Sequence, residues 1–127
     1  MKEQLITFET AQLAKERGFD APSKCYHSDG SFQDRDNLTD YNSWPQNTKD
    51  EFLISAPTQS LLQKWLREIH IHINVCPHGD YKLFLVEIYH PTETNKSGYT
   101  PIEGVRGNTY EEALEKGLIE ALKLIKS

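Results

Sequence analysis

The chain has 127 residues, of which 37% are hydrophobic and 26% are charged, and its formal net charge is −5 at pH 7. This length suits one domain, and the composition is too apolar for a wholly disordered chain. The negative net charge argues against a protein whose main role is to neutralise nucleic-acid phosphates or to coat an anionic membrane, although it leaves room for a local basic patch.

The sequence carries neither a membrane-helix pattern nor a secretion signal. No apolar run approaches the roughly 20 residues that a membrane helix needs, and the N-terminal residues lack the apolar core of a signal peptide. The two cysteines, Cys25 and Cys76, are too few for the disulfide framework of a small secreted protein. We therefore expect a cytoplasmic protein with free thiols and no membrane partner.

The first predicted element is a short helix at Phe8–Arg17. Thr7 suits its N-cap, and Gly18 suits the left-handed residue that ends many helices. The apolar face of this helix is narrow, so we expect it to dock on a core rather than to be stable alone.

The rest of the N-terminal third, from Phe19 to about Glu51, is predicted to be a long loop-rich segment. Turn-forming residues cluster at 28–31 and 34–37, where Asp, Asn, Ser and Gly compete with regular hydrogen-bond ladders. Short strands are allowed at 25–27 and 52–54. A loop of this length is uncommon in a compact domain, which favours a functional or mobile segment.

Residues 56–69 have the pattern of an amphipathic helix. Pro57 suits the first helical position, and five apolar residues recur at helical spacing: Leu61, Leu62, Trp65, Leu66 and Ile69. The following segment, 69–76, alternates strictly between apolar and polar residues, which is the period of a half-buried strand.

A turn is expected at 77–80 and a second strand at 81–89, so that the two strands form an antiparallel hairpin. Both faces of the second strand are apolar, which predicts a more central position in the sheet. The two faces consist of Leu83 and Leu85, and of Phe84, Val86 and Ile88. Residues 91–107 are interpreted as a second loop-rich stretch, with room for a short strand at 102–105.

The closing helix is expected at Tyr110–Ile125, where Thr109 and Glu112 form a capping-box pattern and an apolar stripe includes Leu118. The predicted fold is therefore α+β. It has a small antiparallel sheet of two to four strands, packed by the two amphipathic helices around Trp65 and Leu118, with a short N-terminal helix and a long loop-rich segment. We expect a single domain over 1–127, with the core at about 56–127 and a loop-rich third at 1–55.

Four residues are candidate metal ligands: His70, His72, Cys76 and His78. On one continuous strand the first three share a face, and imidazole and thiolate suit zinc or a similar transition metal. The simpler interpretation is that they are polar residues on the solvent face, because successive positions on one face lie about 7 Å apart. We expect no cofactor, and a small metal-binding protein stays one alternative.

Enzymatic patterns are weak. A thiol lies two residues from an imidazole at Cys25–His27 and at Cys76–His78, but this spacing does not by itself give a catalytic geometry. The glycines match neither a phosphate-binding loop nor a nucleophile elbow. The acidic residues of the long loop lack the spacing of a calcium loop: Asp29, Asp34, Asp36 and Asp40. We predict that the protein is not an enzyme.

Four aromatic residues lie in predicted loops: Phe32, Tyr41, Trp44 and Tyr99. Either they hold the loops on the core, or they form a protein-binding surface, where Trp and Tyr are over-represented.

From Pro57 onward the predicted order of helix, two strands, possible third strand and helix is similar to that of a double-stranded-RNA-binding domain. Such a domain grips phosphates with lysines at the start of its last helix. Here that place holds Glu111 and Glu112, which would repel a phosphate. We therefore expect no nucleic-acid partner, and a nucleic-acid-binding module with this order of elements stays the runner-up, ahead of the metal-binding protein.

Two blocks of sequence, APTQSLLQKWLRE at 56–68 and TYEEALEKGL at 109–118, resemble a group of small proteins of phages, prophages and mobile elements of gut Bacteroidetes. The block FETAQLA at 8–14 and the following Gly18-Phe19 also resemble the start of such proteins. The resemblance implies a phage or mobile-element origin, but it assigns no catalytic or binding residue. The favoured function is a non-enzymatic protein-interaction domain that binds another protein through the loop aromatics.

Overall fold

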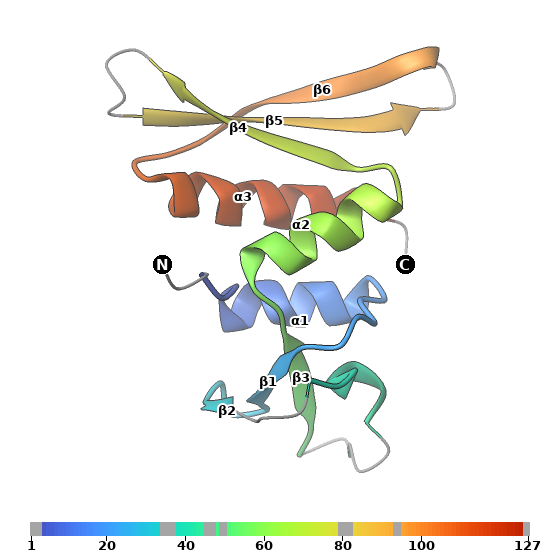
Figure 1. Ribbon diagram of the computed structural model, residues 1–127, viewed down its shortest axis with the longest axis vertical. Helices are drawn as coiled ribbons and strands as arrows, with labels where there is room; N and C mark the ends of the chain where they lie inside the picture. Colours follow the sequence, from blue (N-terminus) through green and yellow to red (C-terminus); the bar gives the residue numbers. More distant parts are fainter. Residues whose placement is uncertain are drawn as a thin grey trace. The chain divides into compact units, whose positions relative to one another are not determined.

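The computed structural model describes residues 4–33, 38–44, 48, 51–78, 83–92 and 95–125, with backbone alone for 78, 90–92 and 95–105. The chain divides into two compact units, Met1–Leu61 with Ile125–Ser127, and Leu62–Leu124. The described residues form three α-helices and two three-stranded antiparallel sheets (Figure 1). The predicted α+β class is confirmed.

In the first unit, helix α1 (Phe8–Glu16) has the predicted ends. The Thr7 side chain caps it by accepting a hydrogen bond from a backbone N–H of the first turn. Gly18 has a φ of +90°, and the Phe19 N–H donates to the Ala14 carbonyl at 3.0 Å. This left-handed closure brings the buried Phe19 back over the last turn of the helix.

The first sheet lies in the segment predicted to be loop-rich. It consists of β1 (Lys24–His27), β2 (Phe32–Gln33) and β3 (Leu53–Ala56), in the order β2–β1–β3. The two strands that the sequence allowed at 25–27 and 52–54 are present as β1 and β3, and β2 is an addition. All four residues of β3 are buried, so this third of the chain has a core of its own.

A short helix, η1 (Tyr41–Ser43), covers the outer edge of β3. The Ser55 N–H donates to Asn42 Oδ1 at 2.9 Å, and the Asn42 N–H donates to Ser55 Oγ at 3.2 Å. The first bond satisfies a backbone N–H that an exposed edge strand would offer to another chain, and the second fixes η1 to the Ser55 side chain.

Helix α2 (Gln59–Glu68) begins later than predicted. Ala56 belongs to β3, where it pairs with Lys24, and the Thr58 hydroxyl accepts the Leu61 N–H at 3.1 Å as an N-cap would. The expected first helical residue, Pro57, was wrong, because its carbonyl accepts the Ile6 N–H at 3.1 Å and α2 begins at Gln59. The pattern of a helix does not reveal that the residues before it bond to distant segments.

His70 closes α2 in the way that Gly18 closes α1. Its φ is +69°, and the next N–H, that of Ile71, donates to the Leu66 carbonyl at 2.9 Å. The strand expected from Ile69 therefore begins only at His72, and the Ile69 side chain is 40% exposed rather than in the core.

We expect His70→Gly to raise the free energy of unfolding by about 1 kcal/mol, because glycine adopts a left-handed backbone without the steric cost that histidine bears there. Chemical denaturation measures the change. Gly18→Ala is the matched control: a Cβ at Gly18 meets nothing within 4 Å, so only its φ is penalised and a loss of similar size is expected. A destabilised His70→Gly variant would show that the imidazole itself holds the turn.

In the second unit, a sheet is formed by β4 (His72–His78), β5 (Leu83–Thr92) and β6 (Asn95–Gly107), in the order β4–β5–β6. The central position predicted for the second strand is confirmed. Two expectations were wrong. A turn was expected at 77–80, but β4 continues to His78. The stretch 91–107 was expected to be loop-rich, but most of it belongs to β5 and β6.

The positions of two prolines explain why the end of β4 and most of β6 were not predicted as strand. The Ile73 carbonyl accepts from the Gln63 side chain at 2.9 Å, so it points away from β5. In an antiparallel ladder, every second residue of an outer strand has its N–H and carbonyl pointing out of the sheet. Pro77 is such a residue on β4, because it lies four residues from Ile73. Following the pairing across β5, Pro101 is such a residue on β6, so neither proline removes a hydrogen bond within the sheet. The two prolines are thus compatible with edge strands, and they hinder strand addition at both edges.

Helix α3 (Tyr110–Lys123) contacts all three strands of the second sheet and lies along one face of it (Figure 1). The predicted cap is present, since Thr109 Oγ1 accepts the Glu112 N–H at 3.0 Å. Leu118 and Leu122 are fully buried. The predicted helix is confirmed except for its last two residues.

Candidate functional site

The three predicted aromatic contacts whose side chains the structure describes differ in their burial. Tyr41 is only 3% exposed and belongs to a core cluster with Cys25 and Leu53. The Trp44 ring packs on Tyr41, with 5.4 Å between ring centroids. Tyr41 thus has the first of the two roles considered for these aromatics, since its ring packs with residues of the first sheet, and its role as a partner contact stays a prediction.

Phe32 is different: its side chain is 39% exposed, and its ring contacts the edge of the Tyr26 ring with centroids 5.8 Å apart. The Tyr26 hydroxyl donates to the Ile6 carbonyl at 2.6 Å, which holds the ring in place. The fourth predicted aromatic, Tyr99, has a side chain outside the described set. Phe32 is thus the one predicted aromatic seen to be largely exposed among the described side chains.

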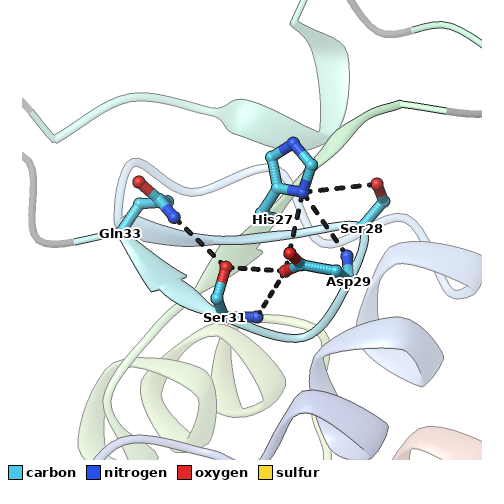
Figure 2. A network of polar contacts seen from close by, with 5 residues as sticks. All are labelled: His27, Ser28, Asp29, Ser31 and Gln33. Atoms are coloured by element: carbon cyan, nitrogen blue, oxygen red, sulfur yellow. Dashed lines mark hydrogen bonds and ion pairs between the residues drawn. The ribbon is translucent and has the colours of Figure 1, made fainter.

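The hairpin between β1 and β2 carries a polar network at its turn (Figure 2). The Gly30 N–H donates to the His27 carbonyl at 2.8 Å, and Gly30 has a φ of +91°, as expected for the last residue of a three-residue hairpin loop. Asp29 Oδ1 accepts both the N–H of Ser31, at 2.8 Å, and its hydroxyl, at 2.6 Å. The turn predicted at 28–31 is confirmed.

This network has the residue types of a nucleophilic triad but not its order. In a triad the imidazole lies between the carboxylate and the serine, whereas here the Asp29 carboxylate lies between Ser31 and His27, whose Nδ1 is 3.6 Å from it. The Ser31 hydroxyl donates to the carboxylate and makes no contact with the imidazole that a triad requires. The network therefore shapes the turn, and Cys25, two residues from His27, is buried in the core.

The Asp29 pKa is lowered from its ordinary value of 3.8, first by the Ser31 hydroxyl, then by the Ser31 N–H, and to a smaller extent by His27. Because the pKa of Asp29 is lower in the folded state than in the unfolded state, its ionised carboxylate stabilises the fold above about pH 4. This stabilisation is lost as the pH falls through the folded-state pKa. We expect Ser31→Ala to move the Asp29 pKa upward, toward 3.8, in an NMR titration. Ser28→Ala is the control, since the Ser28 hydroxyl contacts His27 Nδ1 instead.

The metal candidates do not lie on one strand face. His70 belongs to the turn after α2, so of the candidate ligands with described side chains only His72 and Cys76 share a face of β4. On that face, Cys76 Sγ accepts a hydrogen bond from Asn74 Nδ2 at 3.1 Å. The His78 side chain lies outside the described set. The side chains that the structure describes contain no group of three or more His, Cys, Asp or Glu that could hold a metal ion. The metal-binding alternative stays a prediction.

The second sheet has one face toward α3 and one face that no described element of this unit covers. Val86 and Ile88 are buried on the α3 side, so the alternate residues of β5 lie on the other side. We call this other side the open face. It consists of Leu83, Leu85, Glu87 and Tyr89 on β5, His72, Asn74 and Cys76 on β4, and Arg106 on β6.

The open face has an apolar centre and polar edges. Leu83, Leu85 and Tyr89 lie half-buried on the central strand, whereas Asn74 and Arg106 are exposed on the two outer strands. The Tyr89 hydroxyl donates to the Glu87 carboxylate, which orients both side chains. The sequence indicated this apolar centre, since both faces of β5 are apolar. We interpreted that pattern only as evidence for a central position of the strand in the sheet.

The start of α3 does not offer a phosphate-binding surface. Glu111 and Glu112 are exposed there, and the following lysine, Lys116, lies 3.3 Å from Glu112. Lys123, near the end of the helix, is likewise paired with Glu120 at 3.3 Å. The order of α2, β4, β5, β6 and α3 is the one that the sequence predicted, but its charges are not those of an RNA-binding domain.

Among the described residues, no helix combines the length and the apolar character needed to span a bilayer. Comparisons with protein-family models, with curated proteins and with solved structures found no match.

Proposed function

We propose that this protein is a non-enzymatic protein-interaction domain of phage or mobile-element origin, that it acts in the cytoplasm, and that it binds another protein through the open face. The observation that carries the proposal is the pattern of that face. Leu83, Leu85 and Tyr89 form an apolar centre with a polar rim, which is the anatomy of a protein interface. Tyrosine is also among the residues that dominate binding energy.

The edges of the sheet support a face rather than an edge as the binding surface. Gln63 occupies the outward carbonyl of Ile73, and Pro77 and Pro101 remove outward N–H groups. A partner strand would therefore find incomplete hydrogen bonding at either edge. A partner that covers the open face needs no backbone bonds and gains from burying its apolar centre.

The test is affinity capture of the native protein from its own cells, followed by titration with the purified captured protein. We expect Leu85→Arg to weaken binding at least tenfold, equivalent to about 1.4 kcal/mol. Ile69→Arg is the matched control, because it makes the same change at a residue that is 40% exposed outside the open face. Circular dichroism and a thermal melt check that both variants fold.

Equal loss of binding in the two variants, or no loss in either, would contradict the proposal. Nanomolar binding to duplex RNA that weakens steeply with salt would instead support the nucleic-acid alternative.

A further inference from the structure

We propose that the partner on the open face is a second copy of this chain, so that the protein is a two-fold symmetric dimer with two sheets packed face to face. This inference rests on the proposed function and names the occupant of the same surface. It comes from the charges on the open face, which complement themselves.

Among the described side chains, the open face carries one carboxylate and one guanidinium at fixed register positions. Arg106 lies directly opposite Leu85 on the neighbouring strand, and Glu87 lies two residues along β5 from Leu85. No ion pair joins Arg106 to another residue in the part of the chain that the structure describes. A surface with one charge of each sign beside an apolar centre can pair with a copy of itself, because a two-fold axis makes each contact twice.

The register also fixes how the two copies would cross. Strands lie about 4.8 Å apart and residues rise about 3.4 Å along them, so the positions of Glu87 and Arg106 are known relative to Leu85. A two-fold axis midway between Glu87 and Arg106 brings each into contact with the other's symmetry mate. The same axis places Leu85 beside its own mate and crosses the strands at roughly 70°, closer to the orthogonal than to the aligned packing of two sheets.

The prolines at the two sheet edges also favour packing through the open face. With Pro77 and Pro101 at outward positions, two copies are hindered from joining edge to edge into one continuous sheet. Packing through the open face is then the route by which two copies bury Leu83, Leu85 and Tyr89.

The experiment measures the mass of the full chain by sedimentation equilibrium over a range of concentrations. We expect a dimer whose dissociation constant rises at least tenfold in Glu87→Arg and in Arg106→Glu, since each change creates two like-charge contacts. A one-to-one mixture of these two variants restores both opposite-charge contacts, so we expect it to form a heterodimer as tight as the original. Charge reversals outside the open face, Lys64→Glu and Glu68→Arg on α2, should leave the dissociation constant unchanged.

The outcomes separate the dimer from the proposed function. A chain that stays monomeric at all concentrations overturns the dimer, and if Leu85→Arg still abolishes binding of a captured protein, the proposed function stands without it. A dimer that the charge reversals weaken no more than the controls, or that the mixture fails to restore, uses another surface and also overturns the inference. If a single reversal does not fold, the double variant Glu87→Arg/Arg106→Glu, which keeps both opposite-charge contacts, must dimerise like the original chain.

Discussion

Replacing Leu118 with alanine is expected to lower the free energy of unfolding by roughly 2–5 kcal/mol. Leu118 is fully buried in the middle of α3. Truncation removes apolar contacts and leaves a cavity that the packed surroundings cannot close completely. Denaturant unfolding at an unchanged m-value measures the loss.

Thr109→Ala in the same helix provides the comparison. It removes the side-chain oxygen that accepts the Glu112 N–H, which costs only about 1 kcal/mol. If the two costs were reversed, α3 would be stabilised by its cap rather than by packing, and its position on the sheet would be wrong.

Replacing Gly107 with alanine is expected to cost about 3 kcal/mol, at the upper end of what overpacking costs. A Cβ at Gly107 would lie 2.5 Å from the backbone N of Ala113 and 2.9 Å from its Cα. Because these are backbone atoms in the first turn of α3, no rotation of a side chain relieves the overlap. The end of β6 and the start of α3 must move apart, and thermal or chemical denaturation should register the loss.

Two further variants make the Gly107 result specific. Asn108→Ala changes an exposed neighbour in the same connection, and we expect an effect within about 0.5 kcal/mol. Ala113→Gly should not rescue Gly107→Ala, because the overlap involves backbone atoms rather than the Ala113 methyl group. Stability unchanged by Gly107→Ala would mean that the connection is not as close as described.

Two sets of residues differ in burial from what their residue types suggest: the loop aromatics and the apolar residues of β5. Tyr41 and Trp44 have the composition of a binding surface, yet they stabilise the first unit by joining η1 to β1 and β3. The apolar residues of β5 have the composition of a core, yet half of them lie on the side away from α3. Residue type alone does not separate these roles, because burial depends on which residues a segment meets after folding.

The sequence by itself determined the features that depend on a few neighbouring residues. Thr7 and Thr109 were predicted as helix caps, Gly18 as a helix end and 28–31 as a turn, and each is present in the structure. The groups involved lie within five residues of one another, so their hydrogen bonds are encoded locally. The α+β class and the central position of β5 followed from periodicity, which is also a local property.

Tertiary structure alone decided the start of α2, the extent of β6 and the fate of the two faces of β5. Ala56 became a strand residue by pairing with Lys24, and Pro101 became compatible with a strand because its position faces out of the sheet. His70 took the left-handed place that ends a helix, although the alternation around it is that of a strand. The start of α2 and the extent of β6 each depend on a partner distant in sequence, and the free energy of that pairing outweighs the weak local preferences from which the prediction was made.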